Sequence, residues 1–224
     1  MSASSPTETC WPTLPAFRSR VVPVIALADA AQAVPLAHAL LAGGVDVMEI
    51  TLRTPAAWAA MEAVARQVPG MHVGAGTVTR PEDVRRVVDA GATFALSPGC
   101  TQALVEAVVA ARLPFVPGVM TPSEAMAARD HGFGLLKLFP AAQAGGLAML
   151  QALGGPLADL RFCPTGGVNL ANMAQFLALP NVAMVGGSWL TPADALATGD
   201  WARITRLARE ATASANGHPP HTAT

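Results

Sequence analysis

The chain alternates short apolar runs with longer alanine-rich segments, and this alternation is the strongest constraint on its fold. Runs rich in valine, isoleucine, leucine and phenylalanine, bounded by glycine or proline, are typical of buried strands. They cover 21–27, 45–52, 73–78, 94–97, 115–120, 135–139, 161–165 and 182–185. The predicted helices that follow them cover 30–41, 55–68, 81–90, 101–111, 122–130, 146–153, 170–179 and 201–212. Eight strand–helix units in one chain of 224 residues predict a single (β/α)8 TIM barrel, an α/β fold.

Local signals place several of the predicted boundaries. Gly43-Gly44 is a typical stop for the first helix, whereas Thr54-Pro55 and Thr121-Pro122 predict an N-cap followed by the first turn of a helix. The rival fold is an open doubly wound sheet, but its glycine fingerprint after the first strand is absent. Three prolines inside predicted strands indicate bulges near strand ends: Pro23, Pro117 and Pro164.

The composition excludes several classes of partner. Hydrophobic residues make up 52% of the chain and charged residues 13%, which favours a large buried core over disorder. A net charge of −1 with scattered arginines argues against a surface that binds nucleic acid or an anionic membrane. Charged, proline or glycine residues interrupt every apolar stretch, so no membrane span is predicted.

The ends of the chain differ in character from its middle. We expect a helical or irregular N-terminal extension over 1–20, the barrel over 21–212 and a disordered tail over 213–224. The first 20 residues show no basic stretch followed by an apolar core, so no secretory signal is predicted. Cys10, Cys100 and Cys163 have no paired spacing, which indicates reduced thiols and a cytoplasmic protein.

A lysine, Lys137, lies in the middle of the apolar run 135–139, and it is the only lysine in the sequence. Burying an ammonium among leucines is costly unless the group is paired or loses its proton, and an unprotonated lysine can form a Schiff base. Strand alternation places Leu135, Lys137 and Phe139 on the inner face of the barrel. The alternative is a structural lysine whose amine reaches the surface.

The second predicted strand carries polar residues at alternate positions. Glu49, Thr51 and Arg53 share the inner face, whereas the residues between them are apolar and suit the face under the helices. Glutamate suits general acid/base catalysis, and arginine suits binding of a carboxylate. All three lie toward the carboxyl end of the strand, where barrel enzymes hold their active sites. The alternative is an internal Glu49–Arg53 ion pair without catalytic function.

Glycine-rich loops follow the last two predicted strands, at Gly166-Gly167 and Gly186-Gly187-Ser188. These are the loops in which barrels bind phosphate through backbone N–H groups, although either could be only a tight turn. Thr77 ends the third strand and offers a hydroxyl to an anion site, or serves only as a helix N-cap.

The sequence shows no metal site. Its five histidines have no ligand spacing with a carboxylate or a cysteine: His38, His72, His131, His218 and His221. We therefore expect no metal and no cofactor.

Taken together, the chain resembles the class I aldolases for 2-keto-3-deoxy-6-phosphogluconate (KDPG) and 4-hydroxy-2-oxoglutarate (KHG) from about residue 20 to residue 210. The segment 44–53, Gly-Val-Asp-Val-Met-Glu-Ile-Thr-Leu-Arg, is similar to the family signature around its acid/base glutamate. The segment 132–145, which contains Lys-Leu-Phe-Pro-Ala, is similar to the signature around its Schiff-base lysine. The segments 97–99, 161–167 and 186–190 also resemble the family.

The resemblance implies a reversible cleavage that gives pyruvate and glyceraldehyde 3-phosphate, and glyoxylate from the hydroxy-oxoglutarate substrate. It implies that Lys137 forms the imine, that Glu49 carries protons, and that Arg53 with Thr77 holds the carboxylate of the keto acid. It implies further substrate-binding residues: Pro98, Phe139 and Thr165 near the pyruvyl group, and Gly166, Gly167, Gly187 and Ser188 at the phosphate. Family members are typically homotrimers that need no metal.

Three alternatives remain open. A 2-keto-3-deoxy-6-phosphogalactonate aldolase is similar but differs where Thr51-Leu52-Arg53-Thr54 stands here. A non-catalytic phosphosugar-binding barrel would keep the anion site without forming a covalent adduct with pyruvate. A metal-dependent aldolase would lose activity with a chelator.

Overall fold

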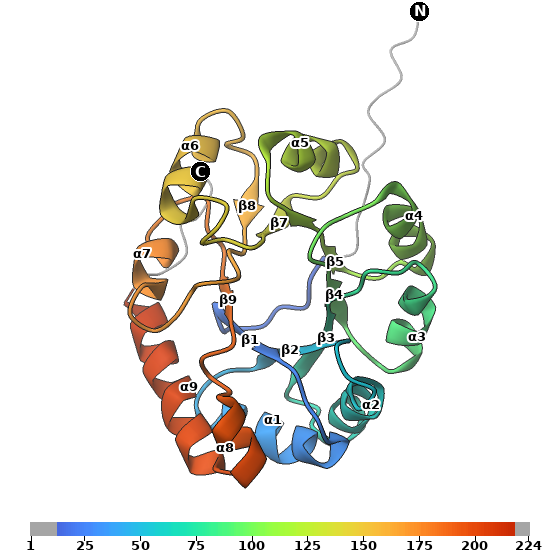
Figure 1. Cartoon of the computed structure of the whole chain (residues 1–224), viewed down its shortest axis with the longest axis vertical. Coiled ribbons are helices and arrows are strands. Elements are labelled where there is room, and N and C mark those ends of the chain that lie inside the picture. Colours follow the sequence, from blue (N-terminus) through green and yellow to red (C-terminus); the bar gives the residue numbers. More distant parts are fainter. Residues whose placement is uncertain (1–12, 218–224) are drawn as a thin grey trace, which may run out of the picture.

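The computed structural model describes residues 13–217 of the chain, in which helices surround a curled parallel sheet (Figure 1). One sheet has the order β5-β4-β3-β2-β1-β9 and a smaller one has the order β6-β7-β8, with every strand pair parallel. The strands are β1 (Val21–Ile25), β2 (Val47–Thr51), β3 (His72–Gly76), β4 (Phe94–Leu96), β5 (Phe115–Val116), β6 (Gly118–Val119), β7 (Leu135–Leu138), β8 (Arg161–Phe162) and β9 (Val185–Gly187).

The two sheets meet at proline-containing segments. Pro117 is the single residue between β5 and β6, where the strand breaks because proline has no N–H to donate to a neighbouring strand. Its carbonyl oxygen still accepts a hydrogen bond from the N–H of Lys137 at 2.8 Å. On the other side, isolated bridges pair Phe162 with Val182 and Thr165 with Gly186. Pro117 marks a break between two strands, whereas the predicted bulge at Pro23 is wrong, because Pro23 pairs with Gly187 in the middle of β1. The fold is α/β with a parallel, curled sheet.

The helices lie on the outer face of the sheet (Figure 1). They are the 3-10 helix η1 (Ala30–Gln32), α1 (Ala33–Ala42), α2 (Ala57–Gln67), α3 (Asp83–Asp89), α4 (Gln102–Ala111), α5 (Pro122–Asp130), α6 (Gly146–Gly154), α7 (Met173–Leu177), α8 (Ala193–Thr198) and α9 (Trp201–Asn216). Within residues 13–217, each helix is too short or too polar to cross a membrane.

Helix caps agree with the sequence at α5 and differ at α2. Thr121 and Glu124 form a reciprocal capping box at α5, with Pro122 in the first turn. The predicted N-cap at Thr54 is wrong, because its hydroxyl instead donates to the carbonyl oxygen of Leu27 at 2.6 Å. Helix α2 begins later, at Ala57. Thr54 therefore ties the end of β2 to the end of β1.

Two predicted boundaries are wrong near the C-terminus. The last strand is β9 at Val185–Gly187, not 182–185, because Gly186 and Gly187 pair with β1 as strand residues. Helix α9 continues to Asn216, beyond the predicted end at 212, because the buried stripe of the helix extends through Ala215. The remaining predicted tail, with its two histidines and paired prolines, lies outside the described residues.

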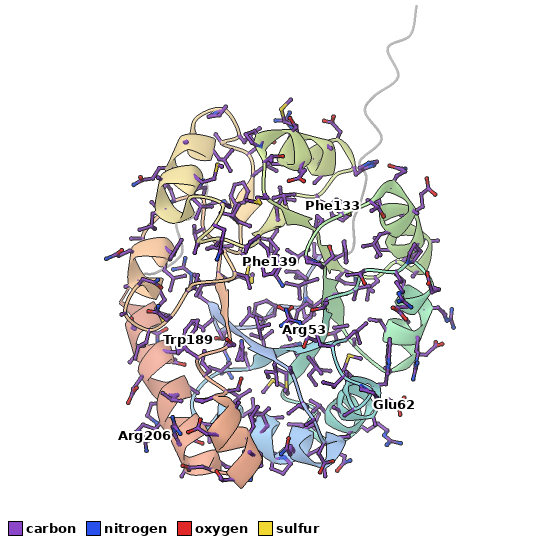
Figure 2. The ribbon with its side chains drawn as sticks, in the orientation of Figure 1. Arg53, Glu62, Phe133, Phe139, Trp189 and Arg206 are labelled. Atoms are coloured by element: carbon purple, nitrogen blue, oxygen red, sulfur yellow. The ribbon has the colours of Figure 1, made fainter. Side chains whose placement is uncertain are left out.

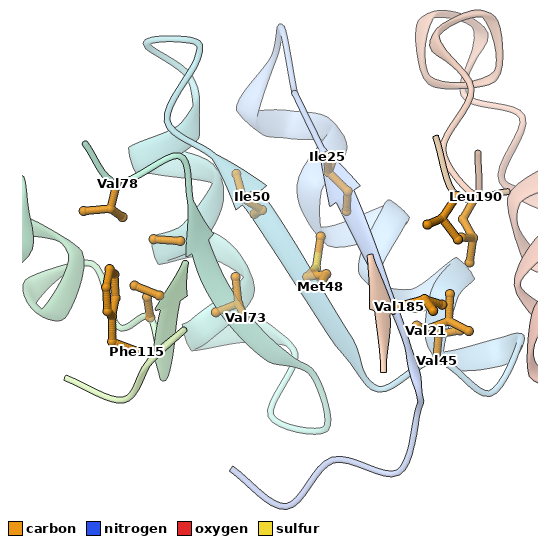
Figure 3. Close-up of a cluster of buried hydrophobic side chains, with 14 of the residues drawn as sticks. Val21, Ile25, Val45, Met48, Ile50, Val73, Val78, Phe115, Val185 and Leu190 are labelled. Carbon is orange, nitrogen blue, oxygen red and sulfur yellow. The ribbon is translucent and has the colours of Figure 1, made fainter. Parts of the chain in front are cut away.

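The main hydrophobic core lies between the sheet and the helices (Figure 3). Met48 and Ile50 of β2 are fully buried there, as strand alternation predicts, and so are Leu136 and Leu138 of β7. Burial on both faces is typical of parallel strands with a helical cover.

A second, smaller cluster fills the sheet interior near the start of the strands. It consists of Val22, Val47, Phe94, Leu96 and Val116. Leu14 and Phe17 pack against it, and the Phe17 ring centre lies 5.9 Å from that of Phe94. The described part of the predicted N-terminal extension thus covers the interior at that end, and residues 1–12 lie outside the described part of the chain.

The same segment is held by Asp46, which is 5% exposed. Its carboxylate accepts hydrogen bonds from the N–H groups of Arg18 and Ser19 at 3.0–3.1 Å and from the Arg18 guanidinium at 3.1 Å. Burial raises the pKa of Asp46, but these hydrogen bonds outweigh it, so the pKa lies below its ordinary value. The charged form of Asp46 therefore stabilises the fold.

We expect Asp46→Asn to lower the free energy of unfolding in urea by roughly 1–3 kcal/mol at neutral pH, because the negative charge is lost and one of the two accepting oxygens is replaced by an NH2 group that cannot accept from these N–H donors. Because the pKa of Asp46 is lower in the folded state, the extra stability of the wild type over Asp46→Asn is fully present above the unfolded-state pKa of about 3.9. This extra stability is lost as the pH falls through the folded-state pKa of Asp46. The exposed pair Arg85–Asp89 offers the control Asp89→Asn, with an expected change within about 0.5 kcal/mol. An equal loss from both substitutions would contradict this role of Asp46.

Candidate active site

A buried ion pair joins β7 to β2 inside the curled sheet. The Nζ of Lys137 lies 3.0 Å from Oε1 of Glu49, and the two residues are 4% and 1% exposed. The prediction of a buried strand lysine is confirmed, and the alternative of an amine that reaches the surface is wrong. The alternative Glu49–Arg53 pair is also wrong, because Glu49 pairs with Lys137 and the side chain of Arg53 lies in an exposed position beyond β2.

The second carboxylate oxygen of Glu49, Oε2, is buried and has no hydrogen-bond partner within residues 13–217. Buried polar atoms in native proteins are nearly always paired, so an unpaired one indicates a functional position. A carboxylate with one oxygen on an amine and free lone pairs on the other is suited to accept a proton from a bound molecule.

Strand alternation places these side chains as predicted. On β7, Leu136 and Leu138 face the helices, whereas Leu135 packs against the inner cluster and Lys137 follows it on the inner face. Lys137 pairs with Gly118 of the neighbouring strand β6. The Nζ of Lys137 lies 5.5 Å from the ring centre of Phe139, the next inner residue.

A cavity of about 560 Å³ opens beside Phe139. Seven of the predicted site residues line it: Arg53, Phe139, Thr165, Gly166, Gly167, Gly187 and Ser188. Figure 2 shows Phe139 and Arg53 within the ring of helices, on the inner side of the sheet. Segments that are distant in sequence therefore meet at one cavity beside the amine.

Sequence reasoning missed part of this wall. Thr191 lines the cavity and is 6% exposed, and the end of β1 contributes Val24, Ile25 and Ala26. Thr51, which strand alternation predicts on the inner face, lines it too, and its hydroxyl donates to the carbonyl oxygen of Ile25 at 2.9 Å. The signal for Thr191 was weak, because a threonine before a proline also suits the start of a helix.

Pro98 and Thr77 lie outside the cavity wall. Pro98 is half-buried and lies next to Gly118. A Cβ on Gly118 would collide with the Pro98 backbone. The Gly118 N–H donates a hydrogen bond to Oγ of Ser97, the residue before Pro98, at 3.2 Å. This places Pro98 beside the strand that pairs with Lys137.

Thr77 follows Gly76 at the end of β3 with φ of 60°, in the left-handed region that a β-branched residue rarely adopts. The alternative of a simple helix N-cap is wrong, since Glu82 occupies the N-cap of α3. Strained residues are typical of functional sites, and Thr77 stands directly after the strand beside Glu49.

Cys163 is a second buried group near the amine. Burial raises the pKa of its thiol to about 12, while the charge of Lys137 and a contact with Thr165 Oγ1 at 3.8 Å act in the opposite direction. The thiol therefore stays protonated at neutral pH and is a poor nucleophile. Lys137 is the group placed for nucleophilic attack.

The first glycine loop has the backbone that the sequence indicates, but the predicted loop at Gly186-Gly187 is wrong, because both residues pair with β1 as part of β9. Gly166 and Gly167 have φ of 95° and 83°, a conformation that favours glycine. Gly187 lies in β9, where the ring of Trp189 occupies the place of a side chain. Ser188 follows it in an exposed position on the cavity wall.

Within residues 13–217, no group of three or more histidine, cysteine, aspartate or glutamate residues is arranged to hold a metal ion. Lys137 and Glu49 are not among the residues that line the cavity, but their ion pair lies next to Phe139 of its wall, and the lining itself contributes the guanidinium of Arg53. This set suits covalent chemistry on a carbonyl compound that carries an anionic group.

Comparison with protein families gives a match to the model described as KDPG and KHG aldolase, over residues 16–207. The 2-dehydro-3-deoxy-phosphogluconate aldolase of Dickeya dadantii is 52% identical over 195 residues, which cover 87% of this chain and 92% of that protein. The KHG/KDPG aldolase of Escherichia coli K12 is 52% identical over 191 residues, 85% of this chain and 90% of that protein.

A solved structure shows the same architecture. KDPG aldolase from Legionella pneumophila, with pyruvate captured as a covalent carbinolamine intermediate, superposes with a TM-score of 0.85 at 45% identity. The match covers 88% of this chain and 95% of that one.

Proposed function

Because this chain belongs to the KDPG and KHG aldolase family, we propose that it is a Schiff-base aldolase, a carbon–carbon lyase, that reversibly cleaves KDPG to pyruvate and glyceraldehyde 3-phosphate. We propose that it also cleaves 4-hydroxy-2-oxoglutarate to pyruvate and glyoxylate. The observation that carries this proposal is the buried pair of Lys137 and Glu49, 3.0 Å apart beside a cavity that Arg53 and Phe139 line.

The reaction begins at the amine of Lys137. Unprotonated Nζ adds to the C2 carbonyl of the keto acid, and loss of water from the carbinolamine gives an imine. The protonated imine accepts the electron pair of the C3–C4 bond, so this bond breaks to an enamine as the C4 hydroxyl becomes an aldehyde. Protonation of the enamine at C3 and hydrolysis of the imine release pyruvate and restore Lys137.

Glu49 moves the protons. It takes the proton of the C4 hydroxyl, directly or through water, and later supplies a proton toward the enamine. Oε2 is the oxygen suited to this role, since Oε1 is already bound to Lys137. The unpaired state of Oε2 and its burial support this assignment.

The remaining site residues bind the two ends of the substrate. We assign the keto-acid carboxylate to Arg53 with Thr77, because a guanidinium forms a bidentate pair with a carboxylate. We assign the pyruvyl wall to Pro98, Phe139 and Thr165. The phosphate would contact the loop at Gly166-Gly167 and the end of β9 at Gly187-Ser188, where backbone N–H groups suit an anion.

We further propose that the curled sheet is a closed (β/α)8 barrel and that one domain runs from β1 to the end of α9. The single residue between β5 and β6 and the Thr165–Gly186 bridge support closure at the two junctions. A cytoplasmic homotrimer that needs no cofactor is our proposal for the working protein, and sedimentation analysis tests the trimer.

Arg53→Gln is expected to raise KM for the keto acid by about 10-fold with a smaller effect on kcat, because an exposed, charge-assisted hydrogen bond to the carboxylate is lost. Arg206→Gln is the matched control, since Arg206 lies on the outside of the helical ring (Figure 2) and should leave KM unchanged. Steady-state kinetics with KDPG measure both. An unchanged KM in Arg53→Gln would remove Arg53 from the carboxylate site.

Turnover of two C4 epimers tests the substrate. We expect pyruvate release from KDPG, and faster cleavage of the galactonate-derived epimer would favour the alternative aldolase. A non-catalytic phosphosugar-binding protein would bind phosphate esters but release no pyruvate from either epimer. Loss of activity with a chelator would favour a metal-dependent aldolase.

A further inference from the structure

We propose that Gly76 is a positioning residue for Glu49. Gly76 ends β3 and pairs with Thr51 of the neighbouring strand β2. A Cβ placed on Gly76 would have its three nearest heavy atoms all in Glu49: Oε1, Cγ at 2.5 Å and Cδ at 2.7 Å. Real Cβ atoms essentially never approach within 3.0 Å of another heavy atom. The carboxylate of Glu49 therefore occupies the volume that any side chain at position 76 would need.

Space, not backbone conformation, requires glycine at this position. Gly76 is not among the glycines with positive φ, so its backbone would accept alanine. Glu49 has little freedom to move aside, because it is 1% exposed and lies in a close-packed interior. A methyl group at position 76 would thus push the carboxylate away from Lys137 or force the strands apart.

Gly74 provides the contrast, because it lies two residues earlier on the same face of β3. A Cβ on Gly74 would meet the ring of Phe94, with Cδ2 at 2.7 Å, and not Glu49. Gly74 makes room for the inner hydrophobic cluster, whereas Gly76 makes room for the carboxylate. Strand β3 therefore has two glycines whose missing side chains leave room for different groups, the ring of Phe94 at Gly74 and the carboxylate of Glu49 at Gly76.

The consequence for catalysis rests on the proposed function. A general base must stay within hydrogen-bond distance of the proton that it transfers, so displacement of Glu49 should lower kcat and leave KM nearly unchanged. Gly76 is not part of the cavity wall, and the three heavy atoms nearest to an added Cβ all belong to Glu49, so the substrate-binding residues should keep their geometry.

The experiment combines Gly76→Ala with Glu49→Ala, which removes all three atoms that the new methyl group would meet. Thermal unfolding is measured for wild type, both single variants and the double variant, with kcat and KM for KDPG on each folded protein. Gly74→Ala, alone and with Glu49→Ala, is the matched control.

Gly76→Ala is expected to lower Tm by roughly 2–12 °C when Glu49 is present and to have almost no effect in the Glu49→Ala background. Gly74→Ala should lower Tm by the same amount in both backgrounds, because Phe94 is present in both. In turnover, Gly76→Ala should lower kcat about 100-fold when Glu49 is present and by no more than about twofold when Glu49→Ala has already removed the carboxylate.

An equal fall of Tm from Gly76→Ala in the two backgrounds would overturn the proposal, as would wild-type kcat in Gly76→Ala. If Gly76→Ala does not fold, recovery of a folded protein on adding Glu49→Ala supports the proposal, and failure of both contradicts it. A wild-type protein without aldolase activity would refute the proposed function alone, since the Tm comparison does not depend on turnover.

Discussion

Lys137→Arg is expected to lower the rate of keto-acid cleavage by a factor on the order of 10⁴–10⁶, because the nucleophile of a covalent mechanism is lost. Arginine stays protonated at every working pH and cannot add to a carbonyl. It keeps a positive charge opposite Glu49, so the carboxylate is not left as an isolated buried charge. The expected loss is therefore one of chemistry, with the fold retained.

The measurement is covalent trapping, and the sequence makes the site of the adduct easy to assign. Lys137 is the only lysine, so the chain has just two primary amines, its Nζ and the N-terminal amine. Incubation with pyruvate and borohydride should add one reduced adduct to wild type, on the peptide that holds Lys137. Lys137→Arg should show none. Normal cleavage by that variant, or an adduct of equal yield at the N-terminus, would contradict the mechanism.

Glu49→Gln is expected to lower kcat by about 10²–10⁴-fold, which is the usual contribution of a positioned general acid/base. Glutamine keeps the length of the side chain and an oxygen that accepts from Lys137, but it cannot take a proton. Imine formation should slow less than C3–C4 cleavage, because the amine remains in place. Borohydride trapping with pyruvate should therefore persist in this variant while turnover of KDPG is largely lost.

Glu62→Gln is the matched control for this prediction, because Glu62 lies exposed on α2 at the outside of the molecule (Figure 2). It should leave both trapping and turnover at the wild-type level. Equal turnover in Glu49→Gln and Glu62→Gln would show that another group transfers the protons. Loss of trapping together with turnover would instead assign Glu49 to imine formation.

Several features of the site could be predicted because they depend on near neighbours in the chain. Alternation along β7 placed Lys137 on the inner face, and the structure confirms its burial. Alternation along β2 separated Glu49 from the outward residues Met48 and Ile50, which are fully buried under the helices. The wrong predictions involve contacts that a local pattern does not contain, such as the hydrogen bond from Thr54 to Leu27, which lies just beyond β1.

The partner of Glu49 illustrates the same limit. A local argument offered Arg53, four positions away on the same predicted face, as the alternative ion-pair partner. Strand β2 ends at Thr51, so Arg53 leaves the sheet and lies exposed at the cavity mouth. The amine that pairs with Glu49 is 88 positions away along the chain.

By itself, the sequence determined the order of strands and helices, the inner and outer faces of the strands, and the residue types available for imine chemistry. These depend on local conformational preference and on the two-residue period of a strand. Only the tertiary structure decided that Glu49 binds Lys137 and that the empty side-chain position of Gly76 receives its carboxylate. The physical reason is that curvature of the sheet brings distant strands together, and close packing then decides which atoms share each space.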